Sequence, residues 1–402
     1  MSIQDKFRRL ATDDAPGQEV RQSCDADFLR GKPLSGRAVD FSHGDVDAHK
    51  PTPGAFEVFA AGVEEGGAQA YTEYRGRADI RDALAIRLAE FTGAPVDAQE
   101  GLIITPGTQG ALFLVIASTV SRGDKVAIVQ PDYFANRKLV EFFEGEMVPV
   151  QIAYQGAAEH EAGLNLDQLE AAFRSGVRLF LFSNPNNPTG VVYSDTEIDR
   201  IATLAGHYGA TVIVDQLYSR LLYEGATYTH LRAHPAAKNV VTIMGPSKTE
   251  SLSGYRLGVA FGPADIISRM EKLQAIVSLR APGYSQAVLR TWFNEPESWM
   301  AHRICQHQAI RDDLVTLFRQ IPGCAVRVPQ AGSYLFPSLP DLAIEPSDFV
   351  KALRLQADVI VTPGTEFGPH TPGSVRLNFS QDHAPAAAAV ERIAALAERY
   401  RA

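Results

Sequence analysis

Lys248 is the residue whose surroundings in this chain of 402 amino acids most clearly suggest chemistry. It follows an apolar run and stands directly after Pro246 and Ser247, with Arg256 shortly behind. A lysine can bond covalently to a carbonyl carbon when its amine is neutral, which burial or neighbouring cations favour. An ordinary lysine is a solvated surface charge. Lys248 alone would fit that description. Whether it is a reactive lysine instead depends on the polar residues that accompany it.

Two other segments bring suitable partners to neighbouring strand ends. Asn187 lies in Ser-Asn-Pro-Asn-Asn-Pro-Thr-Gly, and Asp215 ends the apolar run before Gln-Leu-Tyr218. A buried carboxylate such as that of Asp215 can keep the nitrogen of a bound pyridine ring protonated. An Asp where a strand meets a loop can also simply cap a helix. Near the C-terminus, Arg376 offers the planar fork that binds a carboxylate in two-point fashion. Together these residues favour covalent chemistry on an amino acid at Lys248.

In this order the residues closely resemble the fold-type I aminotransferases of class I/II, the aspartate aminotransferase-like family, from about Phe41 to the C-terminus. The resemblance implies a pyridoxal 5′-phosphate (PLP) cofactor bonded to Lys248, the catalytic residue. It implies cofactor contacts from Thr108, Gln109, Tyr133, Asn187, Asp215, Tyr218, Ser247, Arg256 and Tyr71. It implies substrate contacts from Gly44, Asn187 and Arg376.

The roles that the resemblance implies are specific. Asp215 would face the pyridine nitrogen, Asn187 and Tyr218 the 3′-oxygen, and Tyr133 the ring face. The Thr108–Gln109 turn would hold the phosphate at a helix N-terminus, where backbone N–H groups favour anions. Tyr71 would reach the phosphate of a neighbouring subunit, which implies a homodimer with shared active sites. A packing role for Tyr133 or a surface role for Tyr71 is the simpler alternative.

Three positions depart from the family pattern. Gly245 stands where many relatives carry a phosphate-binding Ser or Thr. Ser333 stands where relatives often carry Phe, which predicts a larger or more polar substrate pocket. Glu250 is an unusual acid so close to Lys248, and we expect its side chain to turn outward.

The expected reaction is a ping-pong transamination between an L-amino acid and a 2-oxo acid. A lyase, decarboxylase or synthase on the same fold is the alternative, because the bond that breaks depends on how the substrate is held. A regulator with a fused DNA-binding domain is disfavoured because only about 40 residues precede Phe41. A dinucleotide-binding module is disfavoured because no G-x-G-x-x-G follows a strand. Arg75, Arg77 and Arg137 remain candidates for a substrate side-chain carboxylate.

The elements that must position these residues alternate along the chain. Helices are expected at 79–92, 110–120 and 194–208, and unbroken apolar strands at 101–105, 126–130, 177–183, 211–215 and 240–244. Such strands predict a mostly parallel sheet with helices on both faces and ligands at the strands' carboxyl edge. Short strands near 325–328, 334–336, 359–362 and 375–379 and helices at 346–355 and from 385 predict a smaller α+β part.

These elements suggest two domains in an α/β fold. We expect a large PLP-binding domain at 56–280 and a small domain made from 1–55 and 281–402. A chain of this length exceeds what one hydrophobic core usually fills. The family resemblance implies the same division.

Composition narrows the class of protein. The net charge is −9, from 38 Lys and Arg against 47 Asp and Glu, which argues against nucleic acid or an anionic membrane as partner. Three scattered cysteines suggest a reducing compartment rather than a disulfide framework. His302, Cys305 and His307 point to different sides of a predicted helix, so we expect no metal site. The N-terminus lacks an apolar signal segment, which predicts a cytoplasmic protein.

Overall fold

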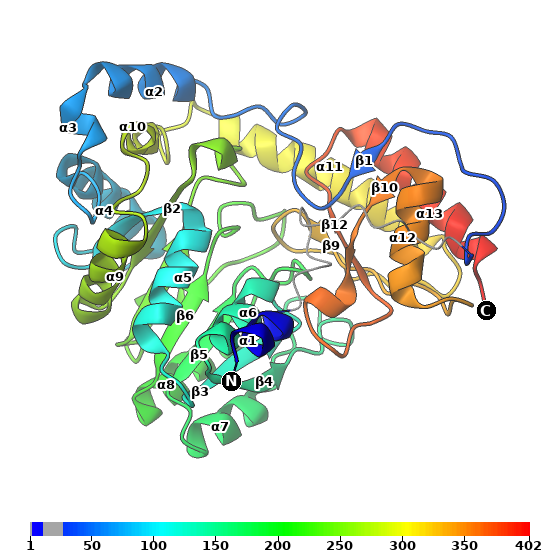
Figure 1. Ribbon diagram of the computed structural model, residues 1–402, viewed down its shortest axis with the longest axis horizontal. Coiled ribbons are helices and arrows are strands. Elements are labelled where there is room, and N and C mark those ends of the chain that lie inside the picture. The colour runs from blue at the N-terminus through cyan, green and yellow to red at the C-terminus, as the bar shows by residue number, and fades with distance from the viewer. Residues whose placement is uncertain (1, 11–26) are drawn as a thin grey trace.

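The centre of the protein is a seven-stranded sheet with the order β2-β8-β7-β6-β5-β3-β4 (Figure 1). The computed structural model describes residues 2–10 and 27–402, so Cys24 lies outside the described residues. The sheet strands are β2 (Leu102–Pro106), β3 (Lys125–Gln130), β4 (Glu146–Gln151), β5 (Leu179–Ser183), β6 (Thr211–Asp215), β7 (Val240–Met244) and β8 (Leu257–Phe261).

Most of this sheet is parallel, as its unbroken apolar strands predict. β4, β3, β5, β6 and β7 pair in parallel, whereas β8 pairs antiparallel with both β7 and β2. Every residue of β5, β7 and β8 is buried. β4 and β8 were not among the strands expected from the sequence. The register pairs Ser183 with Asp215 and Asp215 with Ile243, which brings the strand ends that carry polar residues to one edge.

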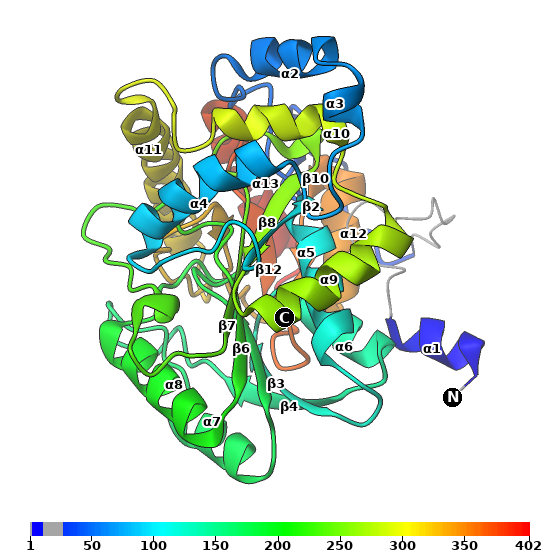
Figure 2. The same cartoon turned by 90° about the vertical axis from the view of Figure 1, so that its left-hand side faces the viewer.

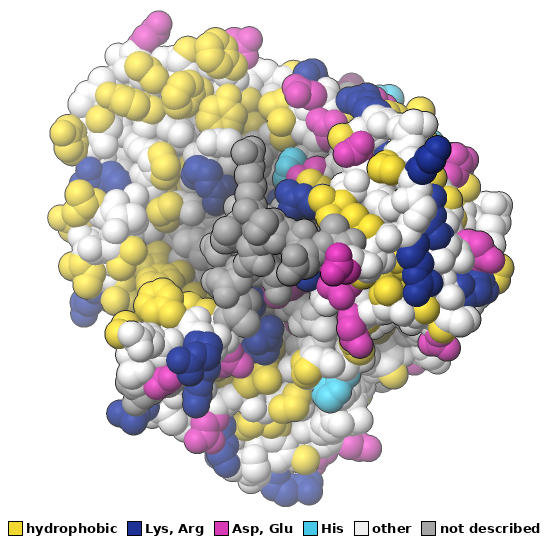
Figure 3. Space-filling view, turned by 45° about the vertical axis from the view of Figure 1, so that its right-hand side comes forward, with side chains coloured by type: hydrophobic (Ala, Val, Ile, Leu, Met, Phe, Trp, Pro, Cys, Tyr) yellow, Lys and Arg dark blue, Asp and Glu magenta, His cyan; other side chains and the backbone are white. Residues whose placement is uncertain are grey.

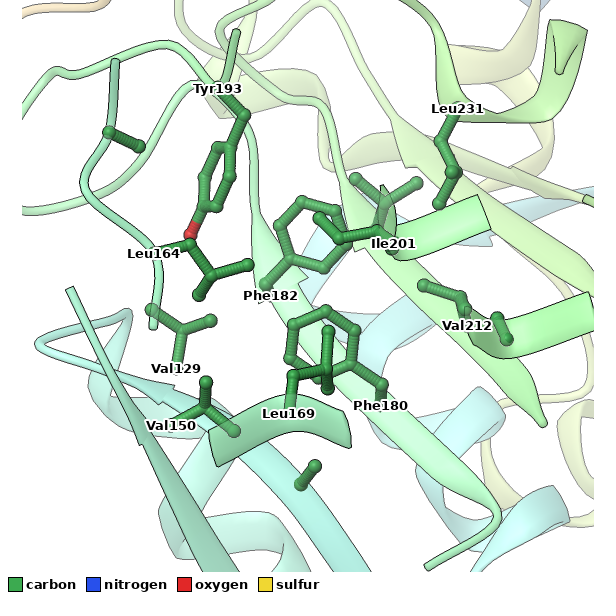
Figure 4. Close-up of a cluster of buried hydrophobic side chains, with 14 of the residues drawn as sticks. Val129, Val150, Leu164, Leu169, Phe180, Phe182, Tyr193, Ile201, Val212 and Leu231 are labelled. Atoms are coloured by element: carbon green, nitrogen blue, oxygen red, sulfur yellow. The ribbon is translucent and has the colours of Figure 1, made fainter. Parts of the chain in front are cut away.

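Helices cover both faces of the sheet, and Figure 2 shows the sheet almost edge-on between them. On one face α7 (Leu166–Arg174) and α8 (Asp195–Tyr208) pack on a core that includes Phe180, Phe182 and Val212 (Figure 4). On the other face α5 (Gly107–Thr119), α6 (Phe134–Phe142) and α9 (Ala264–Val277) pack on side chains such as Leu181 and Ile213. Alternate residues of one strand thus pack into the hydrophobic cores on opposite faces of the sheet.

The beginnings of two helices matter for the sheet edge. Ser194 caps α8 in a capping box with Glu197. α5 begins at Gly107, three residues before the predicted start. The turn Gly107–Gln109 is therefore the first turn of a helix, with backbone N–H groups that the helix itself leaves without partners.

A smaller α+β part lies beside the sheet, on the right in Figure 1. Its strands form a pair, β1 (Val39–Asp40) with β10 (Val359–Ile360), and a triplet, β11 (Thr362–Pro363), β12 (Val375–Asn378) and β9 (Tyr334–Leu335). α11 (Trp299–Arg319), α12 (Pro346–Ala357) and α13 (His383–Arg399) share one core with these strands. The expected strand at 325–328 is wrong, because only a single bridge forms there, between Ala325 and Ser338.

The other helices are α1 (Ile3–Leu10), α2 (Ala55–Glu64), α3 (Gly67–Ala70), α4 (Ala78–Thr92), α10 (Gly283–Gln286) and the short 3₁₀ turns η1 (Leu231–Ala233), η2 (Ser253–Tyr255), η3 (Ala287–Arg290) and η4 (Gly364–Glu366). Of these, α2, α3, α4 and α10 lie at the end of the molecule away from α13, and α1 packs beside α6 (Figure 1). Within the described part of the chain, none of the helices combines the length and the apolar character needed to cross a membrane.

Candidate functional site

A cavity of about 250 Å³ opens at the carboxyl ends of β5, β6 and β7. The structure places ten of the predicted site residues around it: Thr108, Gln109, Tyr133, Asn187, Asp215, Tyr218, Ser247, Lys248, Arg256 and Arg376. They come from five separate strand ends and loops of the sheet and from β12 of the smaller part. Gly44 and Tyr71 do not line this cavity.

One end of the cavity is built to receive an anion. The backbone of Gly107 has φ +76°, and a Cβ there would lie 2.7 Å from Arg256 Nη2. A Cβ at Gly258 would lie 2.4 Å from the Thr108 backbone nitrogen. The two glycines let the start of α5 approach Arg256 and β8 closely. A helix N-terminus beside a guanidinium fits the phosphate group of PLP.

Gly245 has a steric explanation at the same end. A Cβ at this position would lie 2.9 Å from Thr108 Cγ2 and 3.1 Å from the Leu257 carbonyl oxygen. The space that a Ser or Thr would need is thus filled by the Thr108 side chain. The presence of Gly rather than Ser or Thr at position 245 therefore follows from the packing of Thr108.

The middle of the cavity fits the pyridine ring. Asp215 Oδ1 accepts a hydrogen bond from the Leu217 backbone N–H at 3.0 Å, and burial raises the pKa of Asp215 to about 6. A protonated ring nitrogen would give this carboxylate an opposite charge. The Tyr133 hydroxyl donates to Gln109 Oε1 at 3.0 Å, which joins the predicted ring-stacking and phosphate residues. The residues present therefore fit PLP.

The far end of the cavity holds Arg376, which is buried with an exposed fraction of 3%. Its guanidinium donates to Asn187 Oδ1 at 3.0 Å and to the Ser42 carbonyl at 3.3 Å, and it lies over the ring of Tyr334. Its Nε is buried without a hydrogen-bond partner among the described residues. A cation held at the cavity wall by neutral groups is suited to binding a substrate carboxylate.

Sequence reasoning did not identify two residues that organise this cavity. Tyr334 lines it and accepts a hydrogen bond from the Tyr218 hydroxyl at 2.7 Å. Asp132 accepts from the Ser183 hydroxyl at 2.6 Å and the Tyr133 backbone N–H at 2.6 Å, while Ser183 Oγ accepts from the Asn187 backbone N–H at 3.0 Å. Asp132 thus links Tyr133 with Asn187. The position of Asp132 in the sequence, between Pro131 and the predicted ring-stacking residue Tyr133, was the feature that could have identified it.

A second cavity, of about 500 Å³, lies on the other side of Lys248. It shares Lys248, Tyr218 and Ser247 with the first and is also lined by Gly44 and Ser333. Ser333 is therefore placed beside Tyr218, in keeping with a more polar chamber. Tyr71 is 80% exposed on the outer surface.

Two other expectations are settled by the packing. Glu250 was expected to turn outward, but its side chain is buried and paired with Arg220. Arg75, Arg77 and Arg137 line neither cavity. Arg75 is paired with Glu271, Arg77 with Glu65 and Asp79, and Arg137 with Glu141. In residues 2–10 and 27–402 no group of three His, Cys, Asp or Glu side chains is placed to hold a metal ion.

Comparisons with known proteins agree on the family. Residues 38–393 match the family described as aminotransferase class I and II. The asparagine–oxo-acid transaminase of Streptococcus mutans is 27% identical over 84% of this chain and 86% of that protein. The aspartate aminotransferase of Musicola paradisiaca is 26% identical over 91% of this chain and 89% of that protein.

Solved structures show the same architecture. An aspartate aminotransferase from Rhodobacter sphaeroides matches with a TM-score of 0.95 and 69% identity, covering 100% of both chains. The aspartate aminotransferase of Rhizobium meliloti matches with a TM-score of 0.81 at 24% identity, covering 99% of this chain and 96% of that one, a likeness that bears on the fold alone. The chain therefore belongs to the class I and II aminotransferases: it is a PLP-dependent enzyme of fold type I that moves an amino group between an amino acid and a 2-oxo acid.

Proposed function

We propose that this aminotransferase uses L-aspartate as its amino donor and that the cavity around Lys248 is its active site. The substrate is supported by the 69% identity to a structure described as an aspartate aminotransferase. The site is supported by one observation above all, namely that Lys248, Asp215 and Arg376 line a single cavity although they come from distant parts of the chain. The three side chains supply an amine, a carboxylate and a guanidinium.

Lys248 is the proposed catalytic residue. When bound, PLP supplies an aldehyde carbon for the amino group and an electron-withdrawing ring. The Lys248 amine would hold PLP at this aldehyde carbon. When free, the same amine would act as the base that takes the proton from the substrate's α-carbon and as the acid that returns it. Because Lys248 lines both cavities, it stands between the proposed cofactor site and the chamber that contains Gly44.

The other residues of the site orient the substrate and hold the cofactor. Arg376, with Asn187 and the Gly44 backbone, binds the substrate's α-carboxylate and so fixes the direction of the Cα–H bond. Asp215 keeps a proton on the ring nitrogen. The start of α5, Ser247 and Arg256 hold the phosphate, and Tyr133 covers the ring face.

An anaerobic titration of the PLP-loaded enzyme with L-aspartate tests the substrate. We expect the cofactor's absorbance to change to that of its aminated form, with one equivalent of oxaloacetate per active site and no further product until a 2-oxo acid is added. L-asparagine and L-phenylalanine serve as comparison donors. Equal or faster half-reactions with either would contradict aspartate as the donor. Multiple turnovers without an acceptor would contradict the reaction itself.

We also propose that the enzyme is a homodimer whose subunits complete each other's active sites. Large apolar side chains are exposed around α2, α3 and the end of α9: Phe56, Tyr71, Tyr74, Ile276 and Leu279 are 69%, 80%, 44%, 80% and 54% exposed. Figure 3 shows hydrophobic side chains gathered on the upper left of the molecule, where α2 and α3 lie. The Arg280 guanidinium lies over the rings of Tyr71 and Tyr74. Exposed apolar patches of this kind mark protein–protein contacts.

Ile276→Asp is expected to convert the dimer into monomers, because a charge would be buried in the proposed interface without a partner. Sedimentation velocity at micromolar concentration measures the change, and PLP affinity should fall with it because Tyr71 no longer reaches the neighbouring site. Leu355→Asp, at a residue 46% exposed on α12, is the matched control and should remain dimeric. A dimeric Ile276→Asp protein would place the interface elsewhere.

Two further properties belong to the same proposal. Residues 56–280 would form the PLP-binding domain and 1–55 with 281–402 the small domain, in keeping with the separate core around α11, α12 and α13. We propose a cytoplasmic location, supported by the free thiols Cys305 and Cys324, which a reducing compartment preserves.

A further inference from the structure

Glu250 is buried only two residues after Lys248, in a place that the reaction described above does not use. Its side chain is 1% exposed and forms an ion pair with Arg220 Nη1. Burying a carboxylate costs free energy unless it is paired. The ion pair with Arg220 therefore offsets the cost of burying a carboxylate in the loop that carries the proposed catalytic lysine.

Arg220 belongs to the neighbouring strand-end loop and follows Tyr218 by two residues. Its guanidinium also donates two hydrogen bonds to Glu295, from Nη1 to Oε1 at 2.7 Å and from Nη2 to Oε2 at 2.9 Å. The guanidinium lies 4.1 Å from the centroid of the Phe293 ring. A guanidinium can bridge two carboxylates because its donors lie in a rigid plane. Arg220 thus connects the Glu250 loop to the segment that precedes α11.

The backbone of the Lys248 loop is anchored independently of this pair. Arg303 Nη1 donates to the Thr249 carbonyl at 3.2 Å and to the Ser251 hydroxyl at 2.8 Å. The Thr52 backbone N–H donates to the Glu250 carbonyl at 3.1 Å. These bonds attach the loop to α11 and to the chain before α2, not to the Tyr218 loop. The Glu250–Arg220 contact is a direct side-chain link between the loops of Lys248 and Tyr218.

The charge of this cluster depends on pH. Burial, and to a lesser degree the Glu295 charge, raise the pKa of Glu250 to about 7 against the opposing effect of Arg220. Burial also acts to raise the pKa of Glu295, but hydrogen bonds and charge from Arg220 hold it below its ordinary value. Arg220 and Glu295 are the charged groups that act most on Glu250, Arg303 is affected by its charge, and Lys248 is two residues away along the chain. Glu295 therefore stays ionised near neutral pH, while Glu250 gains its charge as the pH rises through about 7.

We propose that Glu250 is a positioning residue that, through Arg220, sets Lys248 relative to Tyr218 and places a buried negative charge two residues along the chain from Lys248. The inference rests on the proposed role of Lys248 as the residue that bonds PLP. Glu250 itself does not touch the reacting atoms. It stabilises a protonated nitrogen at Lys248 only when it is ionised, so its influence is strongest above about pH 7.

Glu250→Gln, compared with wild type and with Glu295→Gln, tests the proposal in the PLP-loaded enzyme. The first readout is the pH midpoint of the bound cofactor's visible absorbance, which we expect Glu250→Gln to lower by roughly one unit because a nearby negative charge is lost. The second readout is kcat at pH 6 and pH 8. We expect about a tenfold loss at pH 8 and less than about a twofold loss at pH 6, where Glu250 is protonated in the wild type. KM should change little.

Glu295→Gln is the matched control, because it removes one carboxylate from the same cluster and leaves the Glu250–Arg220 pair intact. At pH 8 it should lose less kcat than Glu250→Gln, because Glu250 stays ionised and paired with Arg220. Thermal unfolding of each cofactor-free variant checks folding. If Glu250→Gln does not fold, Arg220→Lys replaces it, because a lysine lacks the fork that spans two carboxylates and should produce the same pH-dependent loss.

Two results would overturn the proposal: an unchanged absorbance midpoint in Glu250→Gln, or an equal, pH-independent loss in Glu250→Gln and Glu295→Gln. Neither result affects the assignment of Lys248. That assignment fails if Lys248→Ala keeps the absorbance of the lysine-bound cofactor, so the two failures are distinguishable.

Discussion

Lys248→Ala is expected to lower kcat with L-aspartate by about 10²–10⁴-fold or more, because both the covalent attachment point and the proton-transfer group are removed. Asp215, Arg256 and the start of α5 remain, so the variant should still bind PLP without a covalent bond. Its absorbance should then resemble that of free PLP, and the cofactor should be lost on extended dialysis. Steady-state kinetics and absorbance spectra measure both effects.

Lys238→Ala is the control for this substitution, because Lys238 is exposed on a loop and lines neither the 250 Å³ nor the 500 Å³ cavity around Lys248. It should retain wild-type activity and spectrum. Addition of a small primary amine should restore part of the activity of Lys248→Ala, since an amine diffusing into the cavity can transfer the proton. Substantial turnover by Lys248→Ala without added amine would show that another residue performs the chemistry.

Arg376→Ala is expected to lower kcat/KM for L-aspartate by about 30- to 1000-fold, corresponding to roughly 2–4 kcal/mol for the loss of a buried charge-assisted contact. Arg376→Lys should recover only part of this loss, because an ammonium keeps the charge but not the two-point geometry. The comparison substrate is 3-aminopropionate, which is aspartate without its α-carboxylate. Wild type and both variants should use it equally poorly.

The folding of the Arg376 variants needs its own measurement, because Arg376 also donates to Asn187 Oδ1 and to Thr362 Oγ1 at 3.3 Å. Thermal unfolding of the cofactor-free proteins separates lost stability from lost substrate binding. Arg269→Ala, which removes a surface ion pair with Asp265, should leave kcat/KM unchanged. An equal loss with aspartate and with 3-aminopropionate would mean that Arg376 acts on the cofactor site rather than on the α-carboxylate.

Much of the fold was predictable because it depends on local patterns. Continuous apolar runs predicted β5, β6 and β7 within two residues, and the helix expected at 194–208 matches α8. β4 and β8 were not predicted. β4 includes Pro149 and is exposed or half-buried at five of its six residues, and β8 follows the polar loop that carries Arg256. β4 therefore did not stand out by composition, whereas β8 is a buried apolar run that the same reasoning could have identified.

The cavity was predictable to the extent that a parallel sheet brings strand ends together. Asn187, Asp215 and Lys248 follow three buried strands, so their meeting at one edge follows from the sheet. The positions of Arg376 and Tyr334 do not follow in this way. They come from the smaller part of the molecule, and their contacts with Asn187 and Tyr218 span 189 and 116 residues of sequence.

The sequence by itself thus determined the class of chemistry, through the types and order of Asn187, Asp215, Lys248 and Arg376. The tertiary structure alone decided which polar residues are buried. Glu250 looked like a solvated acid because local patterns say nothing about a partner thirty residues earlier, and it is buried because Arg220 neutralises it. Gly245 looked like a missing contact, yet it leaves the space that Thr108 fills. Both depend on long-range packing, where a charge or a methyl group is accommodated only by its partner from another strand.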